Sequence, residues 1–380
     1  MDLLRYFDFS SEIHKRIKGR RIPVGGAIEI TRRCPLHCIH CYNNLPVDDH
    51  EAKGCELTYD EHCRIIDEIT EAGCLWVLFT GGEIFLRKDF LEIYTYAKKK
   101  GLLITLFTNG ILITQEIADY LVEWRPFSIE MSLYGCTEET HDRVTGSRGS
   151  FEKCIRAIRL LTERKLPLKL KSMALTKNKH EIWGMKQLVE KEIGLQFRFD
   201  AMINPRIDCS EDPLAVRLSP QEVVELDLQD RKRMGEWRKF LEKFNGPVHS
   251  AEDMDELYHC GGGVHSFAID PYGNLKICVL DSSSDGYDLR KGSFRKGWEI
   301  HLLRVRKRKI TRQTKCIQCE MKAMCGMCPE NAQLENKDPE EPVDFLCQVA
   351  HLRAKALGIQ VKPHGECEYC KQKGNNGKME

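Results

Sequence analysis

The feature that most constrains the fold is a regular alternation of short apolar segments and longer amphipathic ones between Gly26 and Ala201. Helix start signals accompany the longer segments. Thr58 and Glu61 form a capping-box pattern, Thr114 opens residues 115–124, and Ser150 opens residues 151–163. The short segments predict six strands, at residues 27–31, 75–79, 102–107, 127–133, 168–175 and 195–201. Six strand–helix units predict a parallel sheet with right-handed crossovers, and hence an open or closed α/β barrel.

In such barrels, functional residues lie on the loops that follow the strands. The loop after the first predicted strand carries Cys34, Cys38 and Cys41. This spacing lets one short loop present three thiolates to a single centre, one ligand fewer than a closed tetrahedral site needs. The missing ligand invites a substrate or cofactor. A zinc site is the alternative on spacing alone, although zinc sites more often use two separated Cys-x2-Cys pairs.

Bulk composition excludes several classes of protein. The 380 residues suffice for roughly two to three domains. A net charge of +1 gives no whole-protein argument for binding nucleic acid or an anionic membrane. The N-terminus lacks a signal-peptide pattern, and no apolar run approaches the ~18 residues of a membrane span. We therefore expect a cytoplasmic protein. Because disulfides are rare in that compartment, its eighteen cysteines indicate metal or cluster binding.

The three-cysteine loop resembles the signature of the radical S-adenosylmethionine (SAM) superfamily, C-x3-C-x2-C at this position of a partial (β/α)6 barrel. The resemblance implies that Cys34, Cys38 and Cys41 hold a [4Fe-4S] cluster whose fourth iron binds SAM. Reductive cleavage of SAM then releases a 5'-deoxyadenosyl radical, which abstracts hydrogen from the substrate. His40 occupies the position where the family often has an aromatic residue near the adenine.

A second match, Thr80-Gly-Gly-Glu83, follows the second predicted strand. Gly81 and Gly82 let the backbone approach a ligand, and Glu83 provides an acceptor for an ammonium group. In the family this motif binds the methionyl amino group. Ser132 ends the fourth predicted strand, where a family hydroxyl often contacts the ribose; a strand-end polar residue is the alternative. Residues 108–110 are a weaker family-like position that is equally typical of a turn.

A second cysteine-rich region resembles the SPASM extension of radical SAM enzymes, which carries two auxiliary [4Fe-4S] clusters. The resemblance implies two sets of ligands. The first auxiliary set is Cys260, Cys278 and Cys328, and the second is Cys316, Cys319, Cys325 and Cys347. The family has three residues between the last two cysteines of the middle group, whereas this chain has two, which leaves the pairing near Cys328 less determined. A four-thiolate zinc site made by the middle group is the alternative.

The first auxiliary set has only three cysteines. We hypothesise either an open iron for substrate or a fourth ligand from Cys367, Cys370 or His265. The alternative for the pair Cys367-x2-Cys370 is exposed thiols on a C-terminal tail.

The expected fold is therefore a partial (β/α)6 TIM-type barrel followed by a small cysteine-rich iron-sulfur SPASM domain. The predicted divisions are an N-terminal segment (1–25), the radical SAM barrel (26–205), a helical connecting segment (206–258), the auxiliary-cluster domain (259–357) and a tail (358–380). Because about 25 residues before the barrel are too few for a peptide-recognition domain, we expect a separate recognition protein.

The expected activity is that of a radical SAM enzyme that modifies a ribosomally made peptide bearing a leader, by crosslinking, oxidation or epimerisation. An external electron donor, flavodoxin or ferredoxin, is implied. A sulfatase-maturing enzyme ranks lower, because relatives of that kind have aspartate where this chain has Val279. Tetrapyrrole or quinone cofactor maturation stays open. A non-catalytic zinc or iron-sulfur binding module would need the Gly-Gly-Glu match to be accidental.

Overall fold

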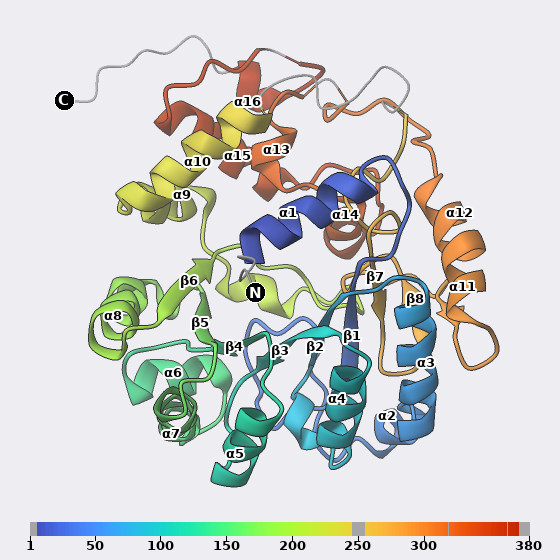
Figure 1. Cartoon of the computed structure of the whole chain (residues 1–380). Helices are drawn as coiled ribbons and strands as arrows, with labels where there is room; N and C mark the ends of the chain where they lie inside the picture. Colours follow the sequence, from blue (N-terminus) through green and yellow to red (C-terminus); the bar gives the residue numbers. More distant parts are fainter. Residues whose placement is uncertain (1–5, 245–254, 318, 363, 372–380) are drawn as a thin grey trace.

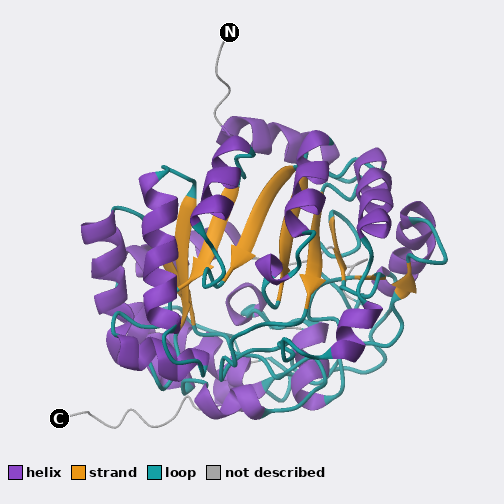
Figure 2. Ribbon diagram, turned by 90° about the horizontal axis from the view of Figure 1, so that it is seen from below, coloured by secondary structure: helices purple, strands orange, loops and turns teal. Residues whose placement is uncertain are grey.

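The six predicted strands form a curved parallel sheet in the computed structural model, which describes residues 6–244, 255–317, 319–362 and 364–371 (Figure 1). Neighbouring strands follow chain order. They are β1 (Gly25–Thr31), β2 (Trp76–Gly81), β3 (Leu103–Thr108), β4 (Ser128–Ser132), β5 (Leu168–Met173) and β6 (Gln196–Asp200). Figure 2 shows the strands flanked by helices, with the arrowheads pointing towards a layer of loops. The predicted α/β barrel is confirmed, in its open form.

Helices cover the outer side of the sheet. They include α2 (His50–Cys55), α3 (Tyr59–Glu71), α4 (Phe90–Lys99), α5 (Gln115–Glu123), α6 (Glu138–Thr145), α7 (Ser150–Glu163) and α8 (Ile182–Gln187). The predicted capping box at Thr58 and Glu61 is confirmed, as is the Thr114 cap. The prediction for Ser150 was wrong: Gly149 caps α7, and the Ser150 hydroxyl instead donates to Asp142 at 2.8 Å.

The cysteine-rich region extends the same sheet. Strand β7 (Ser266–Ile269) pairs in parallel with β1, and the antiparallel strands β8 (Asn274–Lys276) and β9 (Tyr287–Asp288) follow. The order is therefore β6-β5-β4-β3-β2-β1-β7-β8-β9. Two short helices, α11 (Phe294–Lys296) and α12 (Leu303–Arg306), come next. Pairing of β7 with β1 places the start of this region directly beside the strand that leads into the three-cysteine loop.

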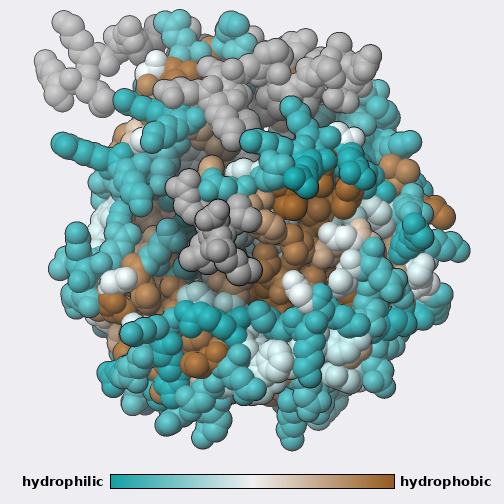
Figure 3. Space-filling model, viewed as in Figure 1, coloured by the Kyte–Doolittle hydropathy of each residue, from teal (hydrophilic) through white to brown (hydrophobic). Residues whose placement is uncertain are grey.

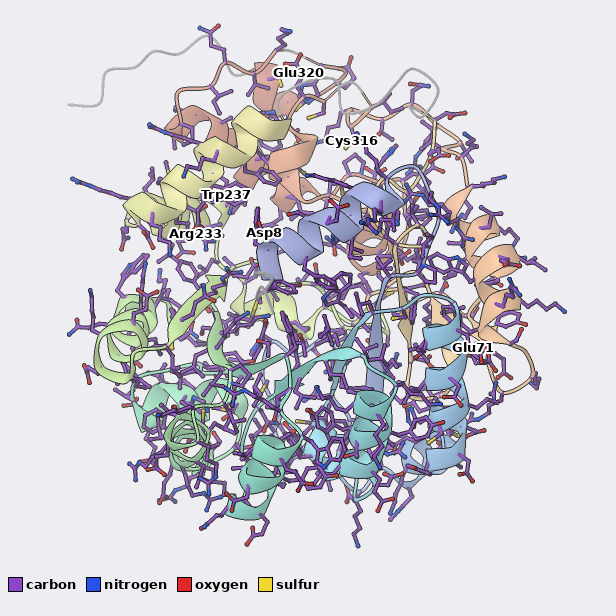
Figure 4. All side chains as sticks on the ribbon, in the orientation of Figure 1. Asp8, Glu71, Arg233, Trp237, Cys316 and Glu320 are labelled. Atoms are coloured by element: carbon purple, nitrogen blue, oxygen red, sulfur yellow. The ribbon has the colours of Figure 1, made fainter. Side chains whose placement is uncertain are left out.

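The predicted connecting segment contains two helices, α9 (Pro220–Leu228) and α10 (Arg231–Phe244); residues 245–254 lie outside the described part of the chain. Helix α9 packs against α15 (Asp344–Ala356), and α10 contacts α13 (Lys322–Cys325). Two further C-terminal helices are α14 (Pro329–Asn336) and α16 (Glu368–Lys371). Arg353 of α15 donates to the buried carboxylate of Asp227 at 2.6 Å and stacks on Trp237 at 4.1 Å. Figure 4 labels Trp237 and Arg233 on α10. This contact fastens α15 to the connecting segment.

One apolar core runs from the barrel strands into the second region, and includes Ile28, Phe79, Phe267, Leu275 and Phe294. The amphipathic helix α1 (Tyr6–Ile17) lies across the face seen in Figure 1. On that face, Figure 3 shows hydrophobic surface gathered near the middle, surrounded by hydrophilic residues. Within the described ranges, none of the helices has the length and apolar character that crossing a membrane would require.

Candidate functional site

The loop after β1 brings the three predicted cluster ligands together. Cys34 is 6% exposed, and Cys38 and Cys41 are half-buried. Burial raises the pKa of the Cys34 thiol to about 12, and the charge of Cys41 adds to the effect. Burial likewise raises the pKa of Cys38, with further contributions from Cys41 and Cys34. The three thiols are therefore close enough to repel one another as thiolates, and they require a cationic centre to be held in that form.

The spacing of these sulfurs distinguishes a cluster from a single ion. In a tetrahedral zinc site the sulfur ligands lie about 3.8 Å apart, since each Zn–S bond is about 2.3 Å. Among the described residues, Cys34, Cys38 and Cys41 do not form a group whose three sulfur atoms all lie within 4.8 Å of one another. A four-iron cluster is larger than one ion and holds its thiolates farther apart. The three cysteines therefore fit a cluster better than the zinc alternative.

Hydrogen bonds to sulfur also support a thiolate at Cys34. The side-chain amide of Asn109 and the backbone N–H of Leu36 both donate to its Sγ, each at 3.4 Å. Such donors stabilise a metal-bound thiolate and orient it. Asn109 lies just after β3, in the turn that the sequence marked as a weaker family-like position. The structure places this turn beside the cysteine loop.

Gly81 and Gly82 lie where the end of β2 meets the start of the cysteine loop. The N–H of Gly82 donates to the carbonyl of Thr31 at 2.6 Å, and that of Glu83 to Arg33 at 3.1 Å. A Cβ on Gly82 would lie 2.4 Å from the Arg33 oxygen, and one on Gly81 2.1 Å from the Thr31 oxygen. Gly81 also has φ of +129°, which L side chains rarely adopt. From the sequence, we expected these glycines to let the backbone approach a ligand. In the structure they instead let two backbone segments pack closely.

Glu83 is fully buried, and its carboxylate joins the loops after β2 and β3. The hydroxyl of Thr108 donates to both oxygens at 2.8 and 2.9 Å, the N–H of Asn109 at 2.8 Å and that of Phe85 at 3.1 Å. Burial raises the pKa of Glu83 to about 7. A carboxylate offers about four acceptor positions, so these three donors leave room for one more.

His40 and Ser132 lie near the thiols, together with a residue that sequence reasoning missed. The buried ring of His40 contacts that of Tyr134 edge-on at 4.7 Å, and burial lowers the pKa of His40 to about 4. The Nδ1 atom of His40 is buried without a hydrogen-bond partner among the described residues. Tyr134 shares a hydrogen bond with Ser132, and burial followed by all three cysteine charges raises its pKa. Its position two residues after Ser132, on the loop following β4, is the signal that could have found it.

Two arginines fix the ends of the cysteine loop. Arg33 forms a bidentate ion pair with Glu56, at 2.9 and 3.0 Å, and both side chains are buried. Arg206 donates to the Cys41 carbonyl at 3.2 Å and to the side chain and carbonyl of Asn44 at 2.8 and 2.7 Å. Arg206 therefore holds the backbone at the third cysteine.

The first auxiliary set is gathered near the barrel loop. Burial raises the pKa of Cys278, and the charges of Glu330 and Cys328 raise it further. Burial also raises the pKa of Cys328, and the charge of Cys260 adds to that effect. Cys278 in turn contributes to the raised pKa of Tyr42, the residue after Cys41. The buried carboxyl of Glu330 accepts a hydrogen bond from Tyr258 at 2.7 Å, and both line a cavity of about 220 Å³. The cavity therefore opens beside the first auxiliary set.

The second auxiliary set lies around α13 and α15, where Figure 4 labels Cys316. Burial raises the pKa of Cys325 to about 12, and the charges of Cys316 and Cys319 add to the effect. The charge of Cys325 in turn helps to raise the pKa of Cys347. The C-terminal pair, Cys367 and Cys370, also lies here. A hydrogen bond joins Cys367 to Cys347.

The positions of Cys367 and Cys370 test two hypotheses from the sequence. One is that they are exposed thiols on a tail, and the other is that one of them is the fourth ligand of the first auxiliary set. Both thiols are buried, which contradicts the alternative of exposed thiols. Their place beside Cys347 also contradicts the idea that this pair completes the first auxiliary set. His265 is still a candidate ligand there, because its Nδ1 is buried without a hydrogen-bond partner in the described part of the chain.

Comparison with known proteins agrees with this geometry. The model of the radical SAM superfamily matches residues 28–189, which include the cysteine loop and Glu83. PqqA peptide cyclase of Bradyrhizobium diazoefficiens is 35% identical over 161 residues, 42% of each chain. Fe-coproporphyrin III synthase of Methanosarcina barkeri is 34% identical over 163 residues, 43% of this chain and 40% of the relative. The chain thus spans about two fifths of the length of these curated relatives.

The likeness to a solved structure covers far more of the chain. Streptococcus suis SuiB bound to its precursor peptide SuiA shares 16% identity, with a TM-score of 0.66 over 91% of this chain and 82% of that one. At this identity the likeness shows the fold, including the arrangement beyond residue 189. The superfamily implies a [4Fe-4S] cluster and SAM as cofactors, which the cysteine loop fits. Over residues 28–189, the chain is thus similar to the radical SAM superfamily.

Proposed function

We propose that this chain is a radical SAM enzyme that modifies a ribosomally made peptide by crosslinking, oxidation or epimerisation. The observation that carries the proposal is the three-thiol loop after β1, braced by the Gly-Gly-Glu turn, in a chain similar to a peptide cyclase. When bound, the cluster and SAM supply a 5'-deoxyadenosyl radical that abstracts hydrogen from the substrate.

The barrel residues around the three-cysteine loop have two proposed roles, holding the cluster and binding SAM. Cys34, Cys38 and Cys41 hold the cluster, and Asn109 stabilises the thiolate of Cys34 through its amide. Glu83 binds the methionyl end of SAM, because the free acceptor position on its carboxylate suits an ammonium group. Gly81 and Gly82 let this turn pack closely against the cysteine loop. His40, Tyr134 and Ser132, which lie near the thiols, contact the adenosyl end. At neutral pH the imidazole of His40 is uncharged, which suits stacking on a base.

The two auxiliary sets hold one [4Fe-4S] cluster each, and they carry electrons rather than generate the radical. Cys260, Cys278 and Cys328 form the set next to Tyr42, and Glu330, which lies near this set, lines the cavity. A cluster held by these cysteines would supply an acceptor for the electron that an oxidative modification leaves on the substrate. His265 would serve as its fourth ligand, or that position would be open for the substrate. Cys316, Cys319, Cys325 and Cys347 form the outer set.

The proposed function implies partners. The substrate is a peptide with a leader, presented by a separate recognition protein, and flavodoxin or ferredoxin delivers the reducing electron. The near-neutral charge of the chain speaks against nucleic acid as a partner.

Maturation of a tetrapyrrole is the second candidate. It rests on a specific observation: Fe-coproporphyrin III synthase matches this chain with nearly the same identity and coverage as PqqA peptide cyclase. Because each match covers only about two fifths of this chain, the two matches do not distinguish between the substrates.

The test presents both substrate classes to the same protein. The full chain, reconstituted anaerobically with iron and sulfide, is incubated with reductant, SAM and either iron coproporphyrin III or the short peptides encoded beside its gene. Mass spectrometry follows each substrate, with deuterated water to detect epimerisation. We expect a peptide to lose hydrogen or take up deuterium, with Cys38→Ala inactive and the exposed Cys55→Ala unaffected. A changed porphyrin with unchanged peptides would favour the second candidate.

A further inference from the structure

Four side chains with metal-binding atoms converge near the C-terminus, beside the second auxiliary set. His351 lies on α15, His364 and Cys367 lie on the segment that follows it, and Cys370 lies on α16. One ligand atom from each lies within 4.8 Å of all the others. His364, Cys367 and Cys370 are 6%, 0% and 8% exposed, and His351 is half-buried. Two imidazoles and two thiols so grouped make a complete ligand set for one ion.

The spacing of these atoms suits a single tetrahedral ion. The Nε2 atom of His351 lies 3.3 Å from the Sγ of Cys370 and 3.6 Å from that of Cys367. The Nδ1 atom of His364 lies 3.3 Å from the Sγ of Cys370. Zn–S bonds of about 2.3 Å and Zn–N bonds of about 2.0–2.1 Å place nitrogen and sulfur ligands about 3.6 Å apart in a regular tetrahedron. Only small shifts therefore separate this arrangement from zinc coordination.

Hydrogen bonds around the group fix it further. The Nδ1 atom of His351 lies 2.8 Å from the carbonyl oxygen of Cys347. Donation to that carbonyl keeps the proton on Nδ1, so that Nε2 presents its lone pair to the thiols. Two successive turns, from the Cys367 N–H to the His364 carbonyl and from the Cys370 N–H to the Cys367 carbonyl, bring the other three ligands to one side. The Nδ1 atom of His364 also lies 3.0 Å from the carbonyl oxygen of Lys362, so zinc binding at Nδ1 would place the ring proton on Nε2.

We propose that His351, His364, Cys367 and Cys370 form a structural zinc site that fastens the segment after α15 onto that helix. Two nitrogen and two thiolate ligands are a typical closed zinc set, with no position left for a substrate. His351 is one helical turn after Cys347, so the zinc ion holds the same face of α15 that carries the predicted cluster ligand. Cys347 is 9% exposed and packs with Cys367, Cys370 and Tyr369. The fastened segment thus covers Cys347.

Metal analysis of the full chain tests the proposal. Protein expressed with added zinc and purified anaerobically is expected to hold about one zinc ion per chain in addition to iron. Cys370→Ala and His364→Ala are expected to lose most of the zinc while iron content and the visible iron-sulfur absorption stay unchanged. Cys55→Ala and His180→Ala, at exposed positions, serve as controls that keep the zinc. Loss of iron instead of zinc in Cys370→Ala would overturn the proposal, because the thiol would then serve a cluster.

Zinc-edge X-ray absorption on the unmodified chain gives a test that needs no variant to fold. Two sulfur ligands at about 2.3 Å and two nitrogen ligands at about 2.0–2.1 Å are expected. Absence of zinc, or a shell of four sulfurs, would overturn the assignment. Limited proteolysis supplies a structural readout: Cys370→Ala is expected to lose the segment after Ala356 several times faster than Cys55→Ala. Equal cleavage rates would contradict a fastening role.

Discussion

Replacement of Arg33 by methionine tests how the cysteine loop is anchored. Arg33 immediately precedes Cys34, and its guanidinium makes two bonds to Glu56, at the C-terminal end of α2, at 2.9 and 3.0 Å. The exposed fractions of the two side chains are 7% and 6%. The hydroxyl of Thr31 also donates to Glu56. Arg33→Met therefore removes the buried partner charge of Glu56 and leaves one hydroxyl in its place.

The expected cost follows from burial. Removing one partner of a buried ion pair leaves an uncompensated charge and costs about 3–5 kcal/mol. The pair between Arg16 and Glu12 has a similar bond of 2.9 Å, but its side chains are 73% and 53% exposed. Exposed pairs contribute about 0–1 kcal/mol, so Arg16→Met is the matched control. The double variant Arg33→Met with Glu56→Leu removes both charges and is expected to recover most of the loss.

Thermal unfolding under anaerobic conditions, at one scan rate for all variants, measures the difference. At about 2–4 °C per kcal/mol, the midpoint is expected to fall by roughly 6–20 °C in Arg33→Met. Arg16→Met is expected to stay within about 4 °C of the parent chain. Equal shifts in the two single variants would refute the argument from burial. A double variant no better than Arg33→Met would show that the loss has another origin.

Two further predictions concern the barrel. Gly82→Ala would place a Cβ at 2.4 and 2.6 Å from backbone oxygens of the cysteine loop. We therefore expect about 1–3 kcal/mol of destabilisation and a lower iron content. Gly54→Ala is the control, because a Cβ at that position meets open space. Burial lowers the pKa of His62 to about 3 from the ordinary 6.5, so the stability it contributes is present above pH 6.5 and is lost as pH falls towards 3. The loss is about 2 kcal/mol between pH 6.5 and 5; urea unfolding should show a flatter pH dependence for His62→Gln, and no such change for the exposed His180→Gln.

Local sequence patterns were sufficient to predict the six strands and two of the three helix starts that were proposed. Strand periodicity and the hydroxyl caps at Thr58 and Thr114 depend on residues within one turn. The cap at Ser150 failed because its hydroxyl bonds to Asp142, a residue of the preceding helix. The pairing of β7 with β1 joins residues more than two hundred positions apart, and no local pattern predicts it.

The same limit applies to the site. The three-cysteine loop and the Gly-Gly-Glu turn are short motifs, so their spacing was visible in the sequence. The roles of Tyr134 and Arg206 were not predicted, because only the fold brings them to the loop. The C-terminal cysteine pair was noticed, but its neighbour His351 lies on α15 and comes close only through tertiary packing. Local sequence patterns therefore could not predict which residues from distant segments come together.

Release of 5'-deoxyadenosine is the most direct test of the claim that the loop after β1 generates a radical from SAM. The full chain is reconstituted anaerobically and incubated with dithionite and SAM, and the product is measured by liquid chromatography and mass spectrometry. We expect release from the parent chain and from Cys55→Ala, and none from Cys38→Ala with its auxiliary iron retained. A parent chain that holds its full iron complement and releases no 5'-deoxyadenosine would contradict the account.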